Sequence, residues 1–188
     1  MSAESATNKE KVIIANCSGF FGDRFSAARE MVQGGPIDFL TGDYLAELTM
    51  AILLRKQLKD PNAGYVSTFL HQMEEVMGEC LAKGIRVVAN AGGLNPRGLA
   101  QKLEEIAAEL GLKPKIAFIE GDNLMARLGD LQAQGEAFVH MDKQISLKDA
   151  NAQPISANAY IGGWGIVEAL RCGADTVSYT HLTLPTTG

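Results

Sequence analysis

Gly84–Leu110, GIRVVANAGGLNPRGLAQKLEEIAAEL, is the most informative stretch of this sequence. Residues 85–89 form a short apolar, largely β-branched run, which is typical of a strand covered on both faces. The turn at 90–93 contains two glycines, and Asn95 and Pro96 suit the N-cap and the first position of a helix. Apolar side chains then recur at helical spacing at Leu99, Leu103, Ile106 and Leu110. The stretch therefore predicts half of a βαβ unit, whose turn is where open α/β sheets bind ligands.

The rest of the chain repeats this layout of strand, turn and helix. Further buried strands are expected at 12–15, 37–40, 116–119 and 174–177. Because strands alternate with helices, the sheet should be mostly parallel, with right-handed crossovers. We predict a three-layer α/β domain built from βα units, which is a Rossmann-like fold; a parallel βα barrel is the alternative.

Helices are expected at 26–33, after a cap at Asp43, at 66–84, at 124–131 and after Ser156. In the helix after Asp43, Leu45, Leu48 and Ile52 recur at helical spacing. In the last helix, the spacing of Tyr160 and Trp164 predicts that both face the core. Residues 137–145 are expected to form an irregular strand or a hairpin.

Composition and charge limit the class of protein. The 188 residues carry a formal net charge of −5, which argues against nucleic acid as a partner because phosphate binding needs a basic face. Neither a membrane span nor a secretory signal is visible, so we predict a cytoplasmic protein that does not bind a membrane. Cys17, Cys80 and Cys172 are odd in number and far apart, as expected for reduced thiols.

Polar residues and glycines follow the first four predicted strands. The carboxyl ends of parallel strands meet at one edge, so these residues should line a common crevice. Helix N-termini there would favour an anionic small molecule, and Arg24 and Arg97 are the first candidates to grip it. The alternative, to which we give equal weight, is that these arginines are solvated on the surface and bind no ligand. The ligand-binding candidates are Asn16, Ser18, Gly19, Asp23, Arg24, Gly42, Asp43, Asn90, Gly92, Gly93, Asn95, Arg97, Gly121 and Asp122.

Individual motifs do not define a reaction. A GxGxxG or GxxxxGK[ST] motif is absent from the sequence. A divalent cation such as Mg²⁺ is one interpretation of Asp43 and Asp122, but helix capping is favoured, and no residue is assigned as a metal ligand. Cys17 could be a nucleophile, although a small buried residue is the favoured interpretation. The catalytic residues and the cofactor therefore stay open.

At Gly92 and Gly93 we expect a ligand to approach the backbone closely, because these residues have no side chain.

Four long strings carry a family resemblance. They are Asn16–Phe25 (NCSGFFGDRF), Gly34–Met50 (GGPIDFLTGDYLAELTM), Asn90–Pro96 (NAGGLNP) and Ser156–Gly162 (SANAYIG) followed by Gly173-Ala-Asp. Together they resemble the acyclic terpene utilisation family AtuA over residues 11–177, the amino-terminal part of a longer domain.

The resemblance implies a role in citronellol and geraniol catabolism. It suggests an enzyme or enzyme component acting on branched isoprenoid acids or their CoA thioesters, so an acyl-CoA is one candidate partner. A non-catalytic binding or assembly subunit of that pathway is the alternative. Association of the chain with further copies of itself, as a homo-oligomer, is left open.

The two ends of the chain differ from the rest. Residues 1–10 are expected to be a disordered lead-in. Residues 178–188 (SYTHLTLPTTG) resemble a translated sequencing adapter, so we predict a non-native tail, with 179–188 exposed and free of any site role.

Overall fold

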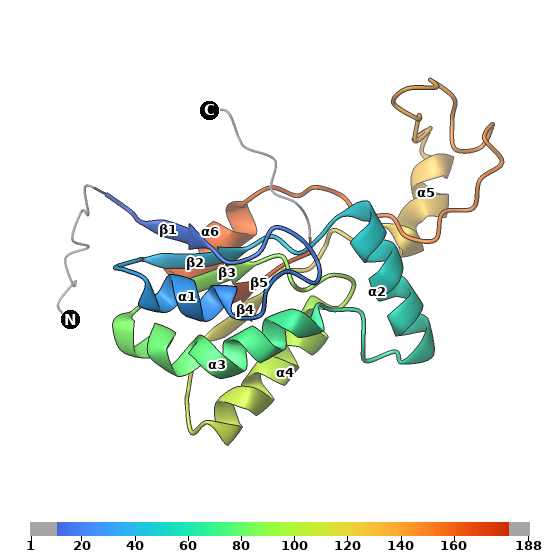
Figure 1. Cartoon of the computed structure of the whole chain (residues 1–188). Helices are drawn as coiled ribbons and strands as arrows, with labels where there is room; N and C mark the ends of the chain where they lie inside the picture. The colour runs from blue at the N-terminus through green and yellow to red at the C-terminus, as the bar shows by residue number, and fades with distance from the viewer. Residues whose placement is uncertain (1–10, 181–188) are drawn as a thin grey trace.

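The computed structural model describes residues 11–180, which contain a five-stranded, all-parallel sheet of order β1-β2-β3-β5-β4 (Figure 1). The strands are β1 (Ile14–Asn16), β2 (Phe39–Gly42), β3 (Arg86–Ala89), β4 (Ile116–Phe118) and β5 (Thr176–Ser178). The sheet is open, with β1 and β4 at its two edges. This confirms the three-layer Rossmann-like prediction and excludes the barrel.

Helices cover the two faces of the sheet unequally. On one face lie α1 (Ala27–Gln33), α3 (Ser67–Lys83) and α4 (Pro96–Glu109), whereas α6 (Trp164–Arg171) lies on the other (Figure 1). The chain advances from β1 to β4 with its helices on the first face, then steps back to β5 through α6. Right-handed crossovers require this change of face when the direction along the sheet reverses.

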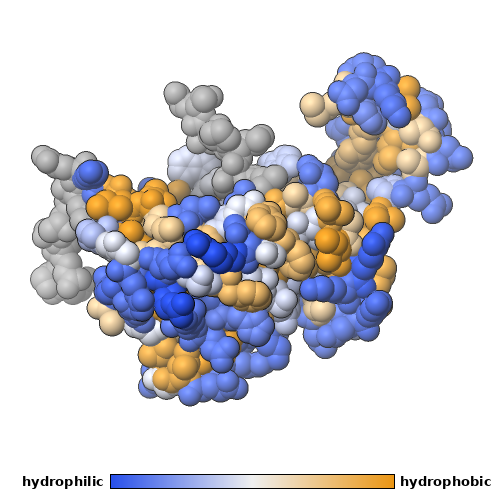
Figure 2. Space-filling model, in the orientation of Figure 1, coloured by the Kyte–Doolittle hydropathy of each residue, from blue (hydrophilic) through white to orange (hydrophobic). Residues whose placement is uncertain are grey.

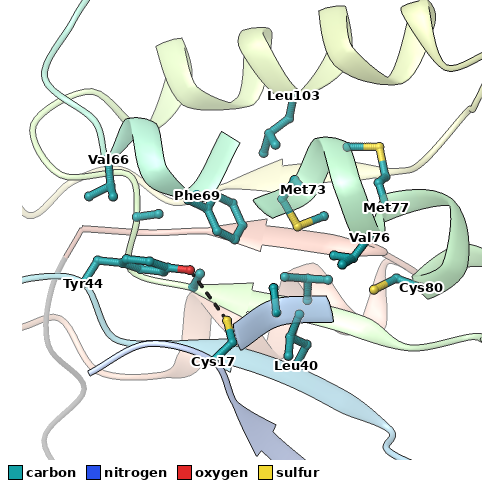
Figure 3. Packing of buried hydrophobic residues seen from close by; sticks show 14 of the residues in the cluster. Cys17, Leu40, Tyr44, Val66, Phe69, Met73, Val76, Met77, Cys80 and Leu103 are labelled. Carbon is teal, nitrogen blue, oxygen red and sulfur yellow. Dashed lines mark hydrogen bonds between the residues drawn. The ribbon is translucent and has the colours of Figure 1, made fainter. Parts of the chain in front are cut away.

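The main core lies between the sheet and α3. Phe69, Met73, Val76 and Cys80 of α3 are all buried, at the spacing that the sequence predicted (Figure 3). Burial of each large apolar side chain contributes about 1.5–3 kcal/mol. The ends of the flanking helices are also as predicted. Gly84 closes α3 at a φ of 68°, and the Asn95 side chain accepts a 2.8 Å hydrogen bond from Gly98 N at the start of α4.

The prediction of a buried first strand is wrong. Ile14 in β1 is 63% exposed, and Val12 and Ile13 are also exposed. Figure 2 shows this apolar patch over β1. The reason is the position of β1 at the sheet edge, where β2 is its only strand neighbour among residues 11–180 and α6 covers the far end of the sheet.

The prediction that Tyr160 and Trp164 face the core is also wrong, since they are 56% and 77% exposed. The helix begins at Trp164, not near Ser156, and packs on the sheet through Ile166, Ala169 and Leu170. Both faces of α6 carry apolar residues, so periodicity alone selected the wrong one.

Helix α2 (Glu47–Lys59) starts later than predicted. Its N-cap is Ala46, so Asp43 lies outside the helix and does not cap it. Leu53 is buried, whereas Leu48, expected on the inner face, is 73% exposed.

Residues 125–155 form an arm that extends away from the sheet (Figure 1). It contains η1 (Met125–Arg127) and α5 (Leu128–Ala133), and none of its residues is buried. At 137–145 there is no assigned strand; His140 N donates to Ile145 O (2.9 Å) and closes a loop instead. Within residues 11–180, no helix is both long and apolar enough to cross a bilayer.

Near the carboxyl end, the exposure expected from residue 179 onward is wrong for Tyr179 and Thr180, which are 9% and 4% exposed. The chain continues the pairing of β5 with β3 at the carboxyl edge of the sheet, because Tyr179 N donates to Ala89 O (3.2 Å). Residues 1–10 and 181–188, and the predictions made for them, lie outside the described range. Ser178 is fully buried, and its Oγ has no hydrogen-bond partner within the described range.

We expect Ser178→Ala to raise the free energy of unfolding by about 1 kcal/mol, because it removes a buried hydroxyl that lacks a partner. Ser18→Ala is the matched control. Ser18 Oγ donates to Phe20 O (3.1 Å), so its loss should lower the same quantity by about 1 kcal/mol. Urea denaturation of both variants measures the difference, and destabilisation by Ser178→Ala would contradict the prediction.

Candidate functional site

The β1–α1 loop uses its predicted site residues for its own structure. Asn16 Nδ2 donates to Ser18 O (2.7 Å), and the backbone N–H groups of Gly19 and Arg24 donate to the Asp23 carboxylate (2.9 and 2.7 Å). These two hydrogen bonds hold the pKa of Asp23 below its ordinary value. Asp23 therefore organises the turn.

Asn90 ties the end of β3 to the β2–α2 loop. Its Oδ1 accepts from Tyr44 N (2.7 Å), and its Nδ2 donates to Asp43 Oδ1 (2.6 Å). Asn90 is only 2% exposed. The structure thus brings Asn90 and Asp43 together as predicted for one sheet edge, but their side chains bond to each other.

Below this clamp lies a buried polar cluster. Tyr44 is fully buried, and its hydroxyl donates to Gln72 Oε1 (2.5 Å). Cys17 Sγ lies 3.6 Å from the Tyr44 hydroxyl oxygen (Figure 3). Desolvation raises the pKa of both Tyr44 and Cys17, so each stays protonated near neutral pH. This environment favours the prediction of Cys17 as a small buried residue over that of a nucleophile.

The glycines of the turns have close protein neighbours. A Cβ at Gly42 would lie 2.5 Å from the Tyr44 ring, and one at Gly92 would lie 2.8 Å from Tyr179 O. Gly93 has a φ of 54°, and its Cβ would lie 2.5 Å from Gly64 O. Packing by itself therefore accounts for these glycines, and the approach of a ligand to Gly92 and Gly93 stays a prediction.

Both candidate arginines are ion-paired on the surface. Arg24 pairs with Glu30 (2.8 Å), and Arg97 pairs with Glu120 (2.8 Å) while lying over the Phe118 ring. Exposed pairs of this kind contribute only about 0–1 kcal/mol to stability. The positive charge of each arginine is nevertheless neutralised by its glutamate partner, which argues against either arginine as the group that binds an anionic ligand.

Two adjoining cavities open at the carboxyl edge of the sheet. The first, of about 210 Å³, lies at the ends of β3 and β4 and is called the β4 cavity. Its lining includes the predicted residues Gly93, Gly121 and Asp122, and also Pro96 and Asn123. The second, of about 200 Å³, lies at the start of α2 and is called the α2 cavity. Leu45, Ala46, Glu47 and Met50 line it, and Asn158 and Thr180 line both cavities.

Sequence reasoning missed the residues of the return segment, defined as 156–160. Ser156, Asn158 and Tyr160 all line the α2 cavity. Ala157 and Ala159 instead make backbone hydrogen bonds to Leu124 and Asp122. The alternation of polar and small residues in SANAY has the period of two that is typical of an extended segment. That signal was present in the sequence.

The arm joins the sheet through a neck of two antiparallel segments. Leu124 N donates to Ala157 O (2.8 Å), and Ala159 N donates to Asp122 O (2.7 Å). Asn158 Nδ2 also donates to Asp122 Oδ2 (2.9 Å). Asp122 is 3% exposed, and no helix follows it directly, so the helix-cap interpretation is wrong here too.

The hollow in the arm and the acidic side chains are weaker candidates for a functional site. The arm encloses a larger hollow of about 750 Å³ beside α5, but none of the arm residues around it is buried, so it is not preorganised. Within residues 11–180 there is no group of three or more His, Cys, Asp or Glu side chains that could hold a metal ion. A Mg²⁺ requirement stays a prediction.

The fold and these cavities define a Rossmann-like α/β protein with a crevice at the carboxyl edge of a parallel sheet, where open α/β sheets commonly bind ligands. Residues 12–178 match the family described as "Acyclic terpene utilisation family protein AtuA". The chain therefore belongs to the AtuA family, as its sequence motifs indicated. The searches of curated proteins and of solved structures returned no match.

We expect Gly92→Ala to lower the free energy of unfolding by about 1–3 kcal/mol, because the new Cβ would overlap Pro96 and Tyr179 O. Gly129→Ala is the control, since nothing lies within 4 Å of its Cβ position. Thermal and urea unfolding of both variants check this. A Gly92→Ala protein as stable as the control would show that the turn has space for a side chain.

Cysteine labelling tests the burial of the thiols. Desolvation raises the pKa of Cys80 to about 12 and also raises that of Cys17, whereas Cys172 is exposed. We expect iodoacetamide at pH 8 to modify Cys172 in the folded protein, and Cys17 and Cys80 only after denaturation. Mass spectrometry of the peptides gives the result. Rapid modification of native Cys17 would revive its role as a nucleophile.

Proposed function

We propose that this AtuA family protein binds a branched acyclic isoprenoid at the carboxyl edge of its sheet, as an enzyme or enzyme component of acyclic terpene catabolism. The family supports a role in acyclic terpene utilisation. The free acids and CoA thioesters that the motifs implied are ligand candidates in this proposal. A cytoplasmic setting suits the three free cysteines.

The observation that carries the proposal is the pair of adjoining cavities with different linings. Leu45 and Met50 offer apolar surface in the α2 cavity, while Asp122 and Asn123 offer polar groups in the β4 cavity. Together the cavities reach the lower part of the volume range of about 300–1,000 Å³ typical of small-ligand sites. An apolar chain with one polar end fits such an arrangement.

A non-catalytic binding or assembly subunit is the second candidate. It is favoured by the lack, within residues 11–180, of any Ser, Thr or Cys side chain hydrogen-bonded to a histidine. The catalytic proposal relies instead on the buried Asp122 and its partly buried hydrogen-bond partner Asn158, which both line the crevice. Turnover of geranyl-CoA and citronellyl-CoA, with and without Mg²⁺, distinguishes the two. Binding without turnover would favour the subunit.

Filling the α2 cavity tests the ligand position. We expect Ala46→Trp to weaken binding of geraniol and geranic acid at least tenfold, because the indole would occupy the space proposed for the isoprenoid chain. Leu48→Trp is the control, since Leu48 lies in the same helical turn but is 73% exposed. Isothermal titration calorimetry measures both variants. Equal binding by Ala46→Trp and the unsubstituted protein would place the ligand elsewhere.

A further inference from the structure

We infer that the β4 cavity holds the polar end of the ligand as an uncharged hydrogen-bond donor, a hydroxyl group accepted by Asp122, and not as a carboxylate. This inference rests on the proposed function and narrows the substrate class from isoprenoid compounds in general to hydroxylated ones. It departs from the anionic ligand expected from the sequence. Three observations lead to it.

The first observation is the incomplete bonding of a buried carboxyl group. Asp122 is 3% exposed, and only Oδ2 has a partner, the Nδ2 group of Asn158 at 2.9 Å. Oδ1 has no hydrogen-bond partner within residues 11–180, yet it is not among the atoms sealed from solvent. Since Asp122 lines the β4 cavity, this oxygen is available to an occupant of the cavity.

The second observation is the chemistry that such an oxygen selects. A carboxylate oxygen only accepts hydrogen bonds, so it requires a donor. Leaving it without one is costly at low exposure, whereas a hydroxyl or a water molecule satisfies it. A ligand carboxylate would instead set two negative charges side by side, which destabilises both.

The third observation is the local balance of charge. Glu120 also lines the β4 cavity, and Glu47 lines the adjoining α2 cavity. Arg97 is bound to Glu120, with its Nη2 at 2.8 Å from Oε2 and its Nε at 3.4 Å from Oε1, and it is not part of the cavity lining. Neither cavity has a Lys, Arg or His side chain in its described lining. The crevice therefore offers acceptors and negative charge to a ligand head group.

The α2 cavity accounts for the rest of the ligand. Leu45 and Met50 line this cavity together with Asn158, which also lines the β4 cavity beside Asp122, so an apolar chain can extend there while the hydroxyl stays at Asp122. Asn158 lines both cavities and orients the carboxyl group through its hydrogen bond. The polar and apolar ends of the ligand are thus assigned to separate cavities.

Geraniol and geranic acid test the inference because they share one carbon chain and differ in the head group. Calorimetry with the full chain at pH 8, where a free acid with a pKa of about 4–5 is ionised, gives the ratio of their affinities. We expect geraniol to bind at least tenfold more tightly. In Asp122→Asn, which keeps the size of the side chain and an acceptor for Asn158, this ratio should fall at least fivefold.

Asp43→Asn is the matched control. It removes the same charge at the same sheet edge but outside the lining of both cavities, and its amide oxygen can still accept the hydrogen bond from Asn90 that holds the loop, so the ratio should stay within about twofold of the original. Circular dichroism and melting temperature establish that each variant is folded. An equal fall of the ratio in both variants would assign the selectivity to overall charge and overturn the role of Asp122.

The outcomes separate this inference from the proposed function. If geranic acid binds as tightly as geraniol or more tightly, the hydroxyl assignment is wrong while the isoprenoid proposal stands. If neither compound binds the unsubstituted protein, the proposed function fails and the inference falls with it. Selective binding of geraniol that Asp122→Asn does not change would place the hydroxyl at another residue.

Discussion

The carboxyl edge of this sheet depends on the side chain of Asn90. Its amide accepts a hydrogen bond from the backbone of Tyr44 and donates one to Asp43, so β3 holds the loop that leads into α2. The bond from Tyr44 N is buried and so does not compete with water, and loss of the amide would leave Tyr44 N without its partner. The position of the α2 cavity follows from this loop.

The same constraint explains why so many polar residues near the strand ends are not free for a ligand. Tyr44 packs against the Cα of Gly42 and bonds to Gln72, and Asp23 binds the N–H groups of its own turn. Buried backbone and side-chain polar groups need partners, and short loops at a sheet edge supply them from neighbouring loops. Polarity at strand ends therefore indicates where a crevice lies more reliably than it indicates which residues face the ligand.

The crevice is completed by the reversal of the chain between β4 and β5. The arm leaves after Asp122 and returns at Asn158, and the hydrogen bond between these two residues joins segments 36 positions apart. The return segment then lines the α2 cavity together with the first turn of α2. A change of direction along the sheet thus brings three distant parts of the chain to one point, as expected for a ligand crevice in an open α/β sheet.

The sequence by itself determined the features that arise from neighbouring residues. The parallel sheet, the buried face of α3, the left-handed Gly84 and the Asn95 cap all follow from local periodicity and backbone preference, and all are present. The family motifs likewise predicted the AtuA match.

The tertiary structure alone decided which of several locally acceptable choices was used. The exposed Ile14, the outward Trp164 and the start of α2 at Glu47 depend on strand order, on the face that α6 presents and on the bond between Asn90 and Asp43. It also separated Asp122, which lines the β4 cavity, from Asp23 and Asp43, which line neither the β4 nor the α2 cavity. Local sequence could not make that distinction, because each carboxylate follows a strand and only long-range packing sets its partner.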